Sequence, residues 1–293
     1  MGSLARHVER LRRKLSQNYL CGNGIEIGAL HQPLAVGANA RVKYVDRLPT
    51  SELRHHYPEL AKLDLVNVDI VDDGQVLSLV PEDSLDFVIA NHVLEHCPNP
   101  LGALNNHFRK LKIGGILYLA IPDMRFSFDR FRKPTEFQHL LWDAEDNGDA
   151  SRAEHFREWA SLVNGITDPD GIEERAAQLM KQDYSIHFHV WSAANFLNFL
   201  ASAQRHLGNT FEIVEVRSNW FEIIAILRKR DPSPPFNSSS SKTALALGSL
   251  RNCLNFRSWL RWTALRFHDL LRPHPGRQPT VRRKKEMTLG SDK

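Results

Sequence analysis

The sequence has 293 residues, 42% of them hydrophobic, and a formal net charge of +4, so one α/β domain with appendages is the expected organisation. Residues 242–293 contain twelve Lys or Arg and three Asp or Glu, a net charge of +9, so the preceding 241 residues carry −5. An acidic body argues against nucleic acid as the substrate, because phosphate binding needs a basic surface.

An amphipathic helix is predicted over residues 4–18. Leu4, Val8, Leu11 and Leu15 are spaced for one face of a helix, with Arg and Lys between them. We expect this helix to pack against the body rather than to cover a ligand site.

A short apolar run at residues 24–29 contains one acid, Glu26, and reaches Gly28 just before a turn. This pattern predicts a buried parallel strand whose carboxyl end meets a ligand. Gly28 has no Cβ and lets the backbone come close to that ligand, whereas a buried Glu26 needs a partner. The next strand, residues 42–46, ends on Asp46, at the distance from Gly28 where nucleotide-binding α/β units place a ribose-binding carboxylate.

Three further apolar runs are expected to extend the parallel sheet, with polar residues at their ends. A short helix within residues 48–62 precedes the first of these runs, and a crossover helix at residues 101–111 separates the second from the third. The three runs are residues 65–70 with Asp69, residues 85–92 with Asn91 and His92, and residues 116–123 with Asp123.

A long insert, residues 124–190, follows the fifth strand and has the apolar spacing of helices. Because it begins at a strand end that faces the ligand edge, we expect it to form a lid over an acceptor pocket. Its last segment, if extended, places His187, His189 and Trp191 on one face.

Ser192 is predicted to cap a helix that runs to about residue 207. Residues 211–216 and 221–227 then form two strands separated by a turn near Asn219. We therefore assign residues 1–230 to one domain.

The remainder of the chain has a different composition. Residues 231–249 are rich in Pro and Ser and are predicted to be a disordered linker. Residues 250–293 combine a basic amphipathic helix with a basic tail, which suggests contact with an anionic membrane surface or a protein partner. The alternative is that the helix in residues 250–293 packs against the domain of residues 1–230.

Several motifs follow one another in a fixed order along the first half of the chain. They are Glu26-Ile27-Gly28, Asp46, Asp69, the block from Asp86 to His96, and Leu111-Lys112-Ile113-Gly114-Gly115. This series resembles class I S-adenosylmethionine-dependent methyltransferases, of the type 11-like kind. The resemblance implies an α/β fold: a Rossmann-like, seven-stranded, mostly parallel sheet with an antiparallel last hairpin, helices on both faces and a helical insert after strand 5.

The same resemblance implies S-adenosylmethionine as the cofactor and gives roles to the strand-end residues. Asp46 would bind the ribose hydroxyls, and Asp69 would lie on the adenine side. The complete predicted cofactor-binding set is Glu26 and Gly28 at the methionine end, Asp46, Asp69, Asn91 and His92.

The first loop departs from the family pattern. Gly28 is followed by Ala29-Leu30-His31-Gln32-Pro33, and a full helix does not fit before the second strand. This short form is similar to methyltransferases associated with bacterial polysaccharide and glycan biosynthesis.

Transfer of a methyl group to a hydroxyl requires a base, and histidine is the usual one near neutral pH. The predicted catalytic candidates are His187, His189 and His96, with His187 or His189 favoured. For His96, in the Leu-Glu-His motif, a structural or cofactor-side role is an equal alternative. A metal site made from Asp123, His187 and His189 ranks below a histidine base, and no metal is predicted.

The favoured function is O-methylation of a sugar or another small hydroxyl acceptor. The alternatives are a cofactor-binding module with weak or no catalysis that recruits partners through its basic tail, and methylation of nitrogen or carbon in a metabolite. Cys21, Cys97 and Cys253 lack pairing motifs, and no apolar run is long enough for a signal peptide or a membrane span. These features predict a cytoplasmic protein.

Overall fold

The computed structural model describes residues 3–57, 60 and 62–231. Apart from Asp231, the predicted linker lies outside the described residues, and so does the predicted basic segment at residues 250–293. The membrane or partner contact of that segment and the cytoplasmic location therefore stay predictions. Within the described part, no helix is both long enough and apolar enough to cross a membrane.

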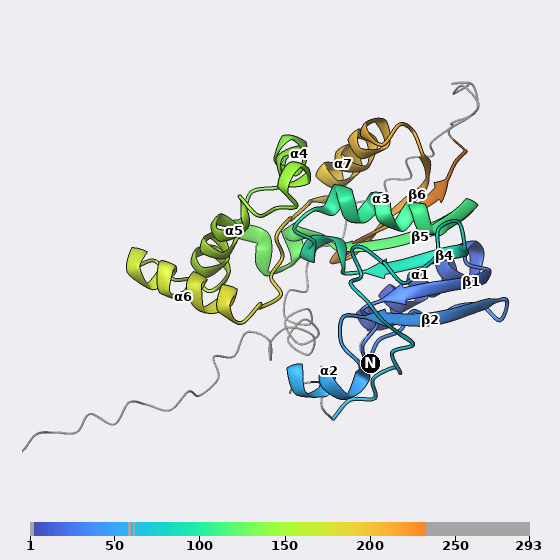
Figure 1. Ribbon diagram of the computed structural model, residues 1–293, viewed down its shortest axis with the longest axis horizontal. Helices are drawn as coiled ribbons and strands as arrows, with labels where there is room; N and C mark the ends of the chain where they lie inside the picture. Colours follow the sequence, from blue (N-terminus) through green and yellow to red (C-terminus); the bar gives the residue numbers. More distant parts are fainter. Residues whose placement is uncertain (1–2, 58–59, 61, 232–293) are drawn as a thin grey trace, which may run out of the picture.

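A seven-stranded sheet with the order β3-β2-β1-β4-β5-β7-β6 forms the centre of the molecule (Figure 1). Six strands run in one direction and β7 runs against its neighbours β5 and β6, which confirms the predicted sheet and its antiparallel last hairpin. The strands are β1 (Gly22–Ile27), β2 (Ala40–Asp46), β3 (Ile70–Val71), β4 (Leu85–Asn91), β5 (Leu111–Pro122), β6 (Phe211–Asn219) and β7 (Glu222–Lys229).

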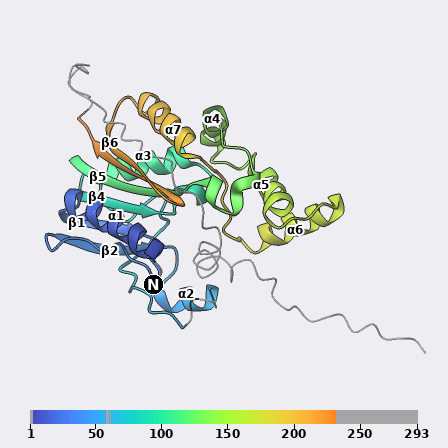
Figure 2. The ribbon, with the colours of Figure 1, turned by 180° about the vertical axis from the view of Figure 1, so that it is seen from behind.

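Helices cover both faces of the sheet, because alternate side chains of each central strand point to opposite sides. In β4, Val88 and Ala90 face a core built with α3 (Pro100–Lys110) and α7 (Ala193–His206). Phe87 and Ile89 face the other side, where α1 (Ser3–Tyr19) packs, as Figures 1 and 2 show from opposite directions. The first helix thus packs against the sheet, as expected.

The third predicted strand is wrong in extent. Only Ile70–Val71 pairs with β2, whereas residues 65–69 were also expected to do so. The carboxylate of Asp69 accepts the amide hydrogen of Tyr44 at 2.8 Å, so a side chain takes the place of a strand carbonyl. Leu65 packs instead into a small cluster with Leu53 and Leu60.

The insert lies beyond the carboxyl ends of the parallel strands, on the side to which the arrows of β1 and β4 point (Figure 1). It has a core of its own, centred on Phe156, Leu179 and Phe188. Its elements are the 3-10 helices η3 (Met124–Phe126) and η4 (Phe128–Phe131), the helices α4 (Phe137–Asp146), α5 (Arg152–Glu158) and α6 (Pro169–Lys181), and the π-helix η5 (Trp159–Val163). Outside it, α2 (Thr50–His56) follows β2, and the 3-10 helix η2 (Leu94–His96) follows β4.

Candidate active site

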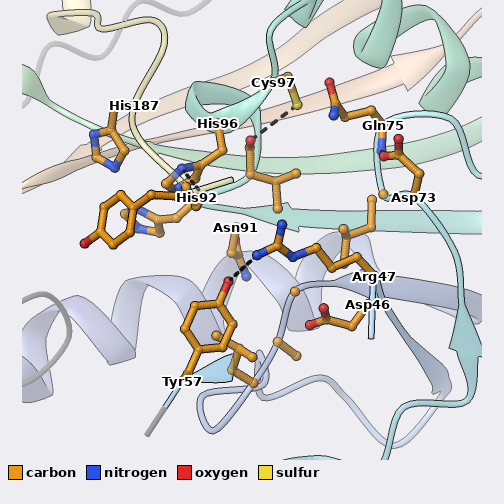
Figure 3. Close-up of a pocket in the computed structure, with 18 of the residues that line it drawn as sticks. Asp46, Arg47, Tyr57, Asp73, Gln75, Asn91, His92, His96, Cys97 and His187 are labelled. Carbon is orange, nitrogen blue, oxygen red and sulfur yellow. Dashed lines mark hydrogen bonds between the residues drawn. The ribbon is translucent and has the colours of Figure 1, made fainter. Parts of the chain in front are cut away.

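A cavity of about 300 Å³ lies between the carboxyl ends of the central strands and the insert. Figure 3 shows Asp46 and Arg47 at one end, His96 and His187 at the other, and Asn91 between them. The volume is at the lower end of the range of about 300–1,000 Å³ for small-molecule sites. Of the predicted site residues, the structure brings Gly28, Asp46, Asn91, His92, His96 and His187 together in its wall.

Gly28 and Glu26 have different positions at the end of β1. Gly28 lines the cavity with a φ of +63°, a left-handed conformation that glycine adopts without a Cβ clash. Glu26 is buried behind the wall, where its carboxylate accepts hydrogen bonds from the amide of Leu34 and the side-chain amide of Asn91. Glu26 therefore fixes the loop that replaces the first crossover helix, and within the described residues it does not line the cavity.

Asp46 ends β2 in the cavity wall. Burial raises the pKa of its carboxyl to about 6, although hydrogen bonds from the amides of Arg47 and Leu48 and the charge of Arg47 act in the opposite direction. A partly desolvated carboxylate of this kind gains from additional hydrogen-bond donors. Its position suits a ligand with adjacent hydroxyl groups.

The acid of the neighbouring loop that lines the cavity is Asp73, and not Asp69. Asp69 directly precedes β3, bound to Tyr44, and is outside the cavity wall, whereas Asp73 and Gln75 line the cavity. The loop is held from α3 by His107, whose ring nitrogen lies 2.8 Å from the carbonyl oxygen of Gly74. The signal in the sequence for this position was Asp72-Asp73-Gly74, which is typical of a turn and follows the third predicted strand directly.

Asn91 ends β4 and His92 follows it, and the two side chains have different surroundings. Asn91 is buried, and its Oδ1 has no hydrogen-bond donor among the described residues. His92 has a φ of +55° and points its Nε2 to within 3.0 Å of the carboxylate of Glu222, beside the guanidinium of Arg12. Asn91 thus offers an acceptor to a ligand, whereas His92 is bound to a buried ion pair.

His96 and His187 contact each other in the wall on the insert side, with ring centroids 4.7 Å apart. Burial and the neighbouring His187 lower the pKa of His96 to about 4, so its ring is neutral at pH 7. Its Nδ1 lies 2.8 Å from the carbonyl oxygen of Ile186, which supports the segment that carries His187.

His187 pairs with Asp129, a buried acid that was not among the predicted site residues. Nδ1 of His187 lies 2.7 Å from Oδ2 of Asp129. Burial opposes ionisation of Asp129, but His187 and Arg132 together hold the pKa of its carboxyl below the ordinary value. An ionised carboxylate at Nδ1 places the hydrogen on that nitrogen and the lone pair on Nε2. The signal in the sequence was an acid between two aromatic residues, Phe128 and Phe131.

His189 does not share a face with His187, so that prediction is wrong. The amides of Phe188 and His189 both donate to the carbonyl oxygen of Glu95, at 2.8 and 3.3 Å, whereas consecutive amides of a strand point in opposite directions. The segment is therefore not a strand, and His189 points to His139 and His155 inside the insert. Asp123 is likewise not with them, because its carboxylate pairs with Arg125.

Comparison with known proteins places this geometry in a family. The model of a methyltransferase domain matches residues 4–204. A comparison with curated proteins gives no match.

Solved structures with a related arrangement include two of archaeal and bacterial origin. The first, from a complex with the Trm112 methyltransferase activator of Haloferax volcanii, is 15% identical over 78% of this chain and 89% of the other, with a TM-score of 0.42. An S-adenosylmethionine-dependent methyltransferase of Thermotoga maritima is 16% identical over 76% and 92%, with a TM-score of 0.40.

The matched domain spans more than half of the chain and includes the sheet edge on which the cavity lies. The chain therefore belongs to the methyltransferase domain family and is a class I S-adenosylmethionine-dependent methyltransferase.

Proposed function

We propose that this enzyme methylates a hydroxyl group of a sugar or another small acceptor, with His187 as the general base. The observation that carries the proposal is the Asp129–His187 pair, whose Oδ2 and Nδ1 atoms lie 2.7 Å apart, with His187 in the cavity wall that also contains Asp46 and with Asp129 buried behind it. A carboxylate that orients an imidazole is the arrangement by which proteins prepare a base for a hydroxyl proton.

The cavity wall fits S-adenosylmethionine in three places. Asp46 would accept hydrogen bonds from the ribose hydroxyls, and Asp73 and Gln75 would lie on the adenine side. At the methionine end, Oδ1 of Asn91 is a buried acceptor for the ammonium group, and the backbone at Gly28 permits close approach. Glu26 would act indirectly, by holding the Gly28 loop.

When bound, the cofactor supplies an electrophilic methyl group and a sulfonium leaving group. His187 would take the acceptor proton at Nε2 as the oxygen forms its bond to the methyl carbon and the carbon–sulfur bond breaks. Asp129 would stabilise the imidazolium that results, and His96, neutral at pH 7, adds no competing positive charge. The insert would exclude water from this reaction as a lid.

The acceptor end of the cavity is aromatic, with Phe128, Trp159 and Tyr184 in its wall. Trp159 opens the π-helix η5, an element that is frequent at functional sites. Its Nε1 has no hydrogen-bond acceptor among the described residues, although the residue is 97% buried (3% exposed). Apolar faces with a few polar groups suit a sugar ring, which presents both C–H and hydroxyl surfaces.

Replacing Asp46 with alanine is expected to weaken S-adenosylmethionine binding about tenfold to a hundredfold, the loss of a charge-assisted hydrogen bond of about 1.5–3 kcal/mol. Because binding favours the ionised carboxylate, wild-type affinity should fall as the pH drops below about 6, up to about tenfold per pH unit. The Asp46→Ala variant should lack this dependence. Isothermal titration calorimetry at several pH values measures both effects.

The control for this experiment is Asp69→Ala, which removes a neighbouring acid that lies outside the cavity. Its cofactor affinity should remain close to that of the wild type. Unchanged affinity in Asp46→Ala, or a larger loss in Asp69→Ala, would contradict the proposed ribose site.

The function itself is tested by incubating the enzyme with methyl-labelled S-adenosylmethionine and a panel of acceptors. The panel contains monosaccharides, nucleotide sugars, short glycans, phenols, amines and carbon acids, and NMR of the product identifies the methylated atom. We expect label on a hydroxyl oxygen of a sugar-containing acceptor. Label on nitrogen or carbon alone would overturn the proposal and leave the enzyme class unchanged.

A further inference from the structure

Four side chains with metal-binding atoms converge inside the insert, away from the cavity wall. His139 and Asp143 lie one turn apart on α4, His155 lies on α5, and His189 comes from the segment that returns to the sheet. One donor atom from each lies within 4.8 Å of every other. We call these four residues the insert cluster.

The spacing of the donor atoms matches a tetrahedral site. Nε2 of His139 lies 3.1 Å from Nε2 of His155 and 3.2 Å from Oδ2 of Asp143, and Nε2 of His189 lies 3.5 Å from the same oxygen. A zinc ion binds nitrogen and oxygen ligands at about 2.0–2.1 Å, so the edges of its coordination tetrahedron are about 3.3–3.4 Å long.

The orientation of the three histidine rings is also compatible with a tetrahedral metal site. The ring centroids of His139, His155 and His189 are 5.0, 5.1 and 5.7 Å apart, and the ring planes cross at 64–82°. An imidazole bound through one nitrogen places its centroid about 3.2 Å from the metal, which gives centroid separations of about 5.2 Å around a tetrahedron. Edge-to-face packing of rings also gives crossed planes, so the short distances between the donor atoms are the observation that points to an ion.

One acceptor at the centre of the cluster is unsatisfied, whereas Nε2 of His189 also lies 3.2 Å from the carbonyl oxygen of Pro98. Oδ2 of Asp143 accepts no hydrogen bond from the described residues, although Asp143 is only 2% exposed. Its other oxygen accepts the hydroxyl hydrogen of Ser151, as expected for a carboxylate ligand oriented by a second residue. The two facing Nε2 atoms of His139 and His155 cannot both donate to each other. A cation at the centre would bind Oδ2 of Asp143 and the three Nε2 atoms, and it would take Nε2 of His189 from the carbonyl oxygen of Pro98.

We propose that the insert cluster binds one Zn²⁺ ion, with His139, Asp143, His155 and His189 as its four ligands. Three imidazoles and one carboxylate are suited to zinc, and four protein ligands form a closed, structural site rather than a catalytic one. The ligands that connect α4 and α5 to the return segment would fix His189, two residues beyond His187. The metal would therefore stabilise the lid and position the base without entering the reaction.

The full-length enzyme, purified without a polyhistidine tag and equilibrated with Zn²⁺, is expected to contain about one zinc per chain by elemental analysis. Replacement of zinc by Co²⁺ should give the visible absorption of a tetrahedral site without thiolate bands. Removal of zinc with a chelator should lower the melting temperature by roughly 10 °C, because the metal binds only the folded state. None of these readouts depends on methyl transfer.

Measuring zinc binding in single-residue variants would show which side chains bind the ion. His155→Gln and His189→Gln should each lower zinc affinity on the order of a hundredfold or more, and Ser151→Ala by about tenfold to a hundredfold. His107→Gln, a buried histidine of α3 outside the cluster, is the matched control and should retain the metal. His187→Gln should also retain it, which excludes the second group of donors, Glu95, His96 and His187.

Absence of zinc from the equilibrated wild-type enzyme would overturn the proposal, as would an octahedral cobalt spectrum. Retention of zinc in His155→Gln together with its loss in His187→Gln would place the ion in the cavity wall instead. Because metal content and spectrum are measured on wild-type protein, the proposal stays testable even if a ligand variant fails to fold.

Discussion

Replacing His187 with alanine is expected to lower kcat by roughly a hundredfold to ten-thousandfold, the usual contribution of a general base. The affinity for S-adenosylmethionine should change little, because the proposed base would contact the acceptor hydroxyl and not the cofactor. Steady-state rates with the acceptor from the panel measure the first effect and calorimetry measures the second. The combination separates a catalytic role from a role in cofactor binding.

Two variants of neighbouring residues serve as controls. Asp129→Asn keeps the size of the side chain but removes the charge that holds His187, so it should also lower kcat without weakening cofactor binding. His96→Gln changes the other histidine of the same wall and should cost less, because His96 supports the backbone at Ile186. Full activity in His187→Ala, or a larger loss in His96→Gln, would move the catalytic base to another residue.

Elements marked by local signals could be predicted from the sequence. Ser192 was expected to cap a helix, and its hydroxyl accepts the amide hydrogen of Asn195 at the start of α7. Pro100 stands in the first turn of α3, after the cap Asn99. The last hairpin turns beside Asn219, as expected. Each of these signals acts within a few residues, so neighbouring sequence is sufficient to reveal it.

The positions of the side chains in the candidate site depend on contacts between residues far apart in the sequence. The sequence alone was less informative about these contacts. The boundary of β3 is set by the side chain of Asp69 on Tyr44, 25 residues away, and this moved the cavity-lining acid from Asp69 to Asp73. His187 and His189 separate because the carbonyl oxygen of Glu95 binds two consecutive amides. Neither contact is encoded in a periodic pattern. The sequence was sufficient to locate the ends of the strands. It was not sufficient to identify which side chains meet at those ends.

The buried ion pair between Arg12 and Glu222 is a further contact that the sequence did not reveal, since 210 residues separate its partners. Nε of Arg12 donates to Glu222 at 2.8 Å, and Nη2 donates to the second carboxylate oxygen. Asn219 donates to both Glu222 and the carbonyl oxygen of Val8, so α1 is joined twice to the turn before β7. His92 lies 3.0 Å from the same carboxylate and lines the cavity. The pair therefore connects the first helix to the wall of the cavity.

Replacing Arg12 with alanine is expected to destabilise the fold by about 3–5 kcal/mol, because it leaves the charge of Glu222 buried without its main partner. For a folded region of this size, the melting temperature should fall by roughly 6–20 °C. Arg13→Ala, the next residue on the exposed side of α1, is the matched control and should have little effect. The double variant Arg12→Met, Glu222→Leu should lose less stability than Arg12→Ala, because it buries no uncompensated charge.

The pH dependence of stability gives an independent measure of the same pair. Burial opposes ionisation of Glu222, but Arg12 and His92 hold the pKa of its carboxyl well below the ordinary value of 4.5. A group with a depressed folded-state pKa stabilises the fold fully above its unfolded pKa, and this stability is lost as the pH falls below about 4.5. Urea unfolding at pH 3–7 should show a steeper acid-side loss for the wild type than for the double variant. Equal slopes, or an Arg12→Ala variant as stable as Arg13→Ala, would show that α1 is held by its apolar face alone.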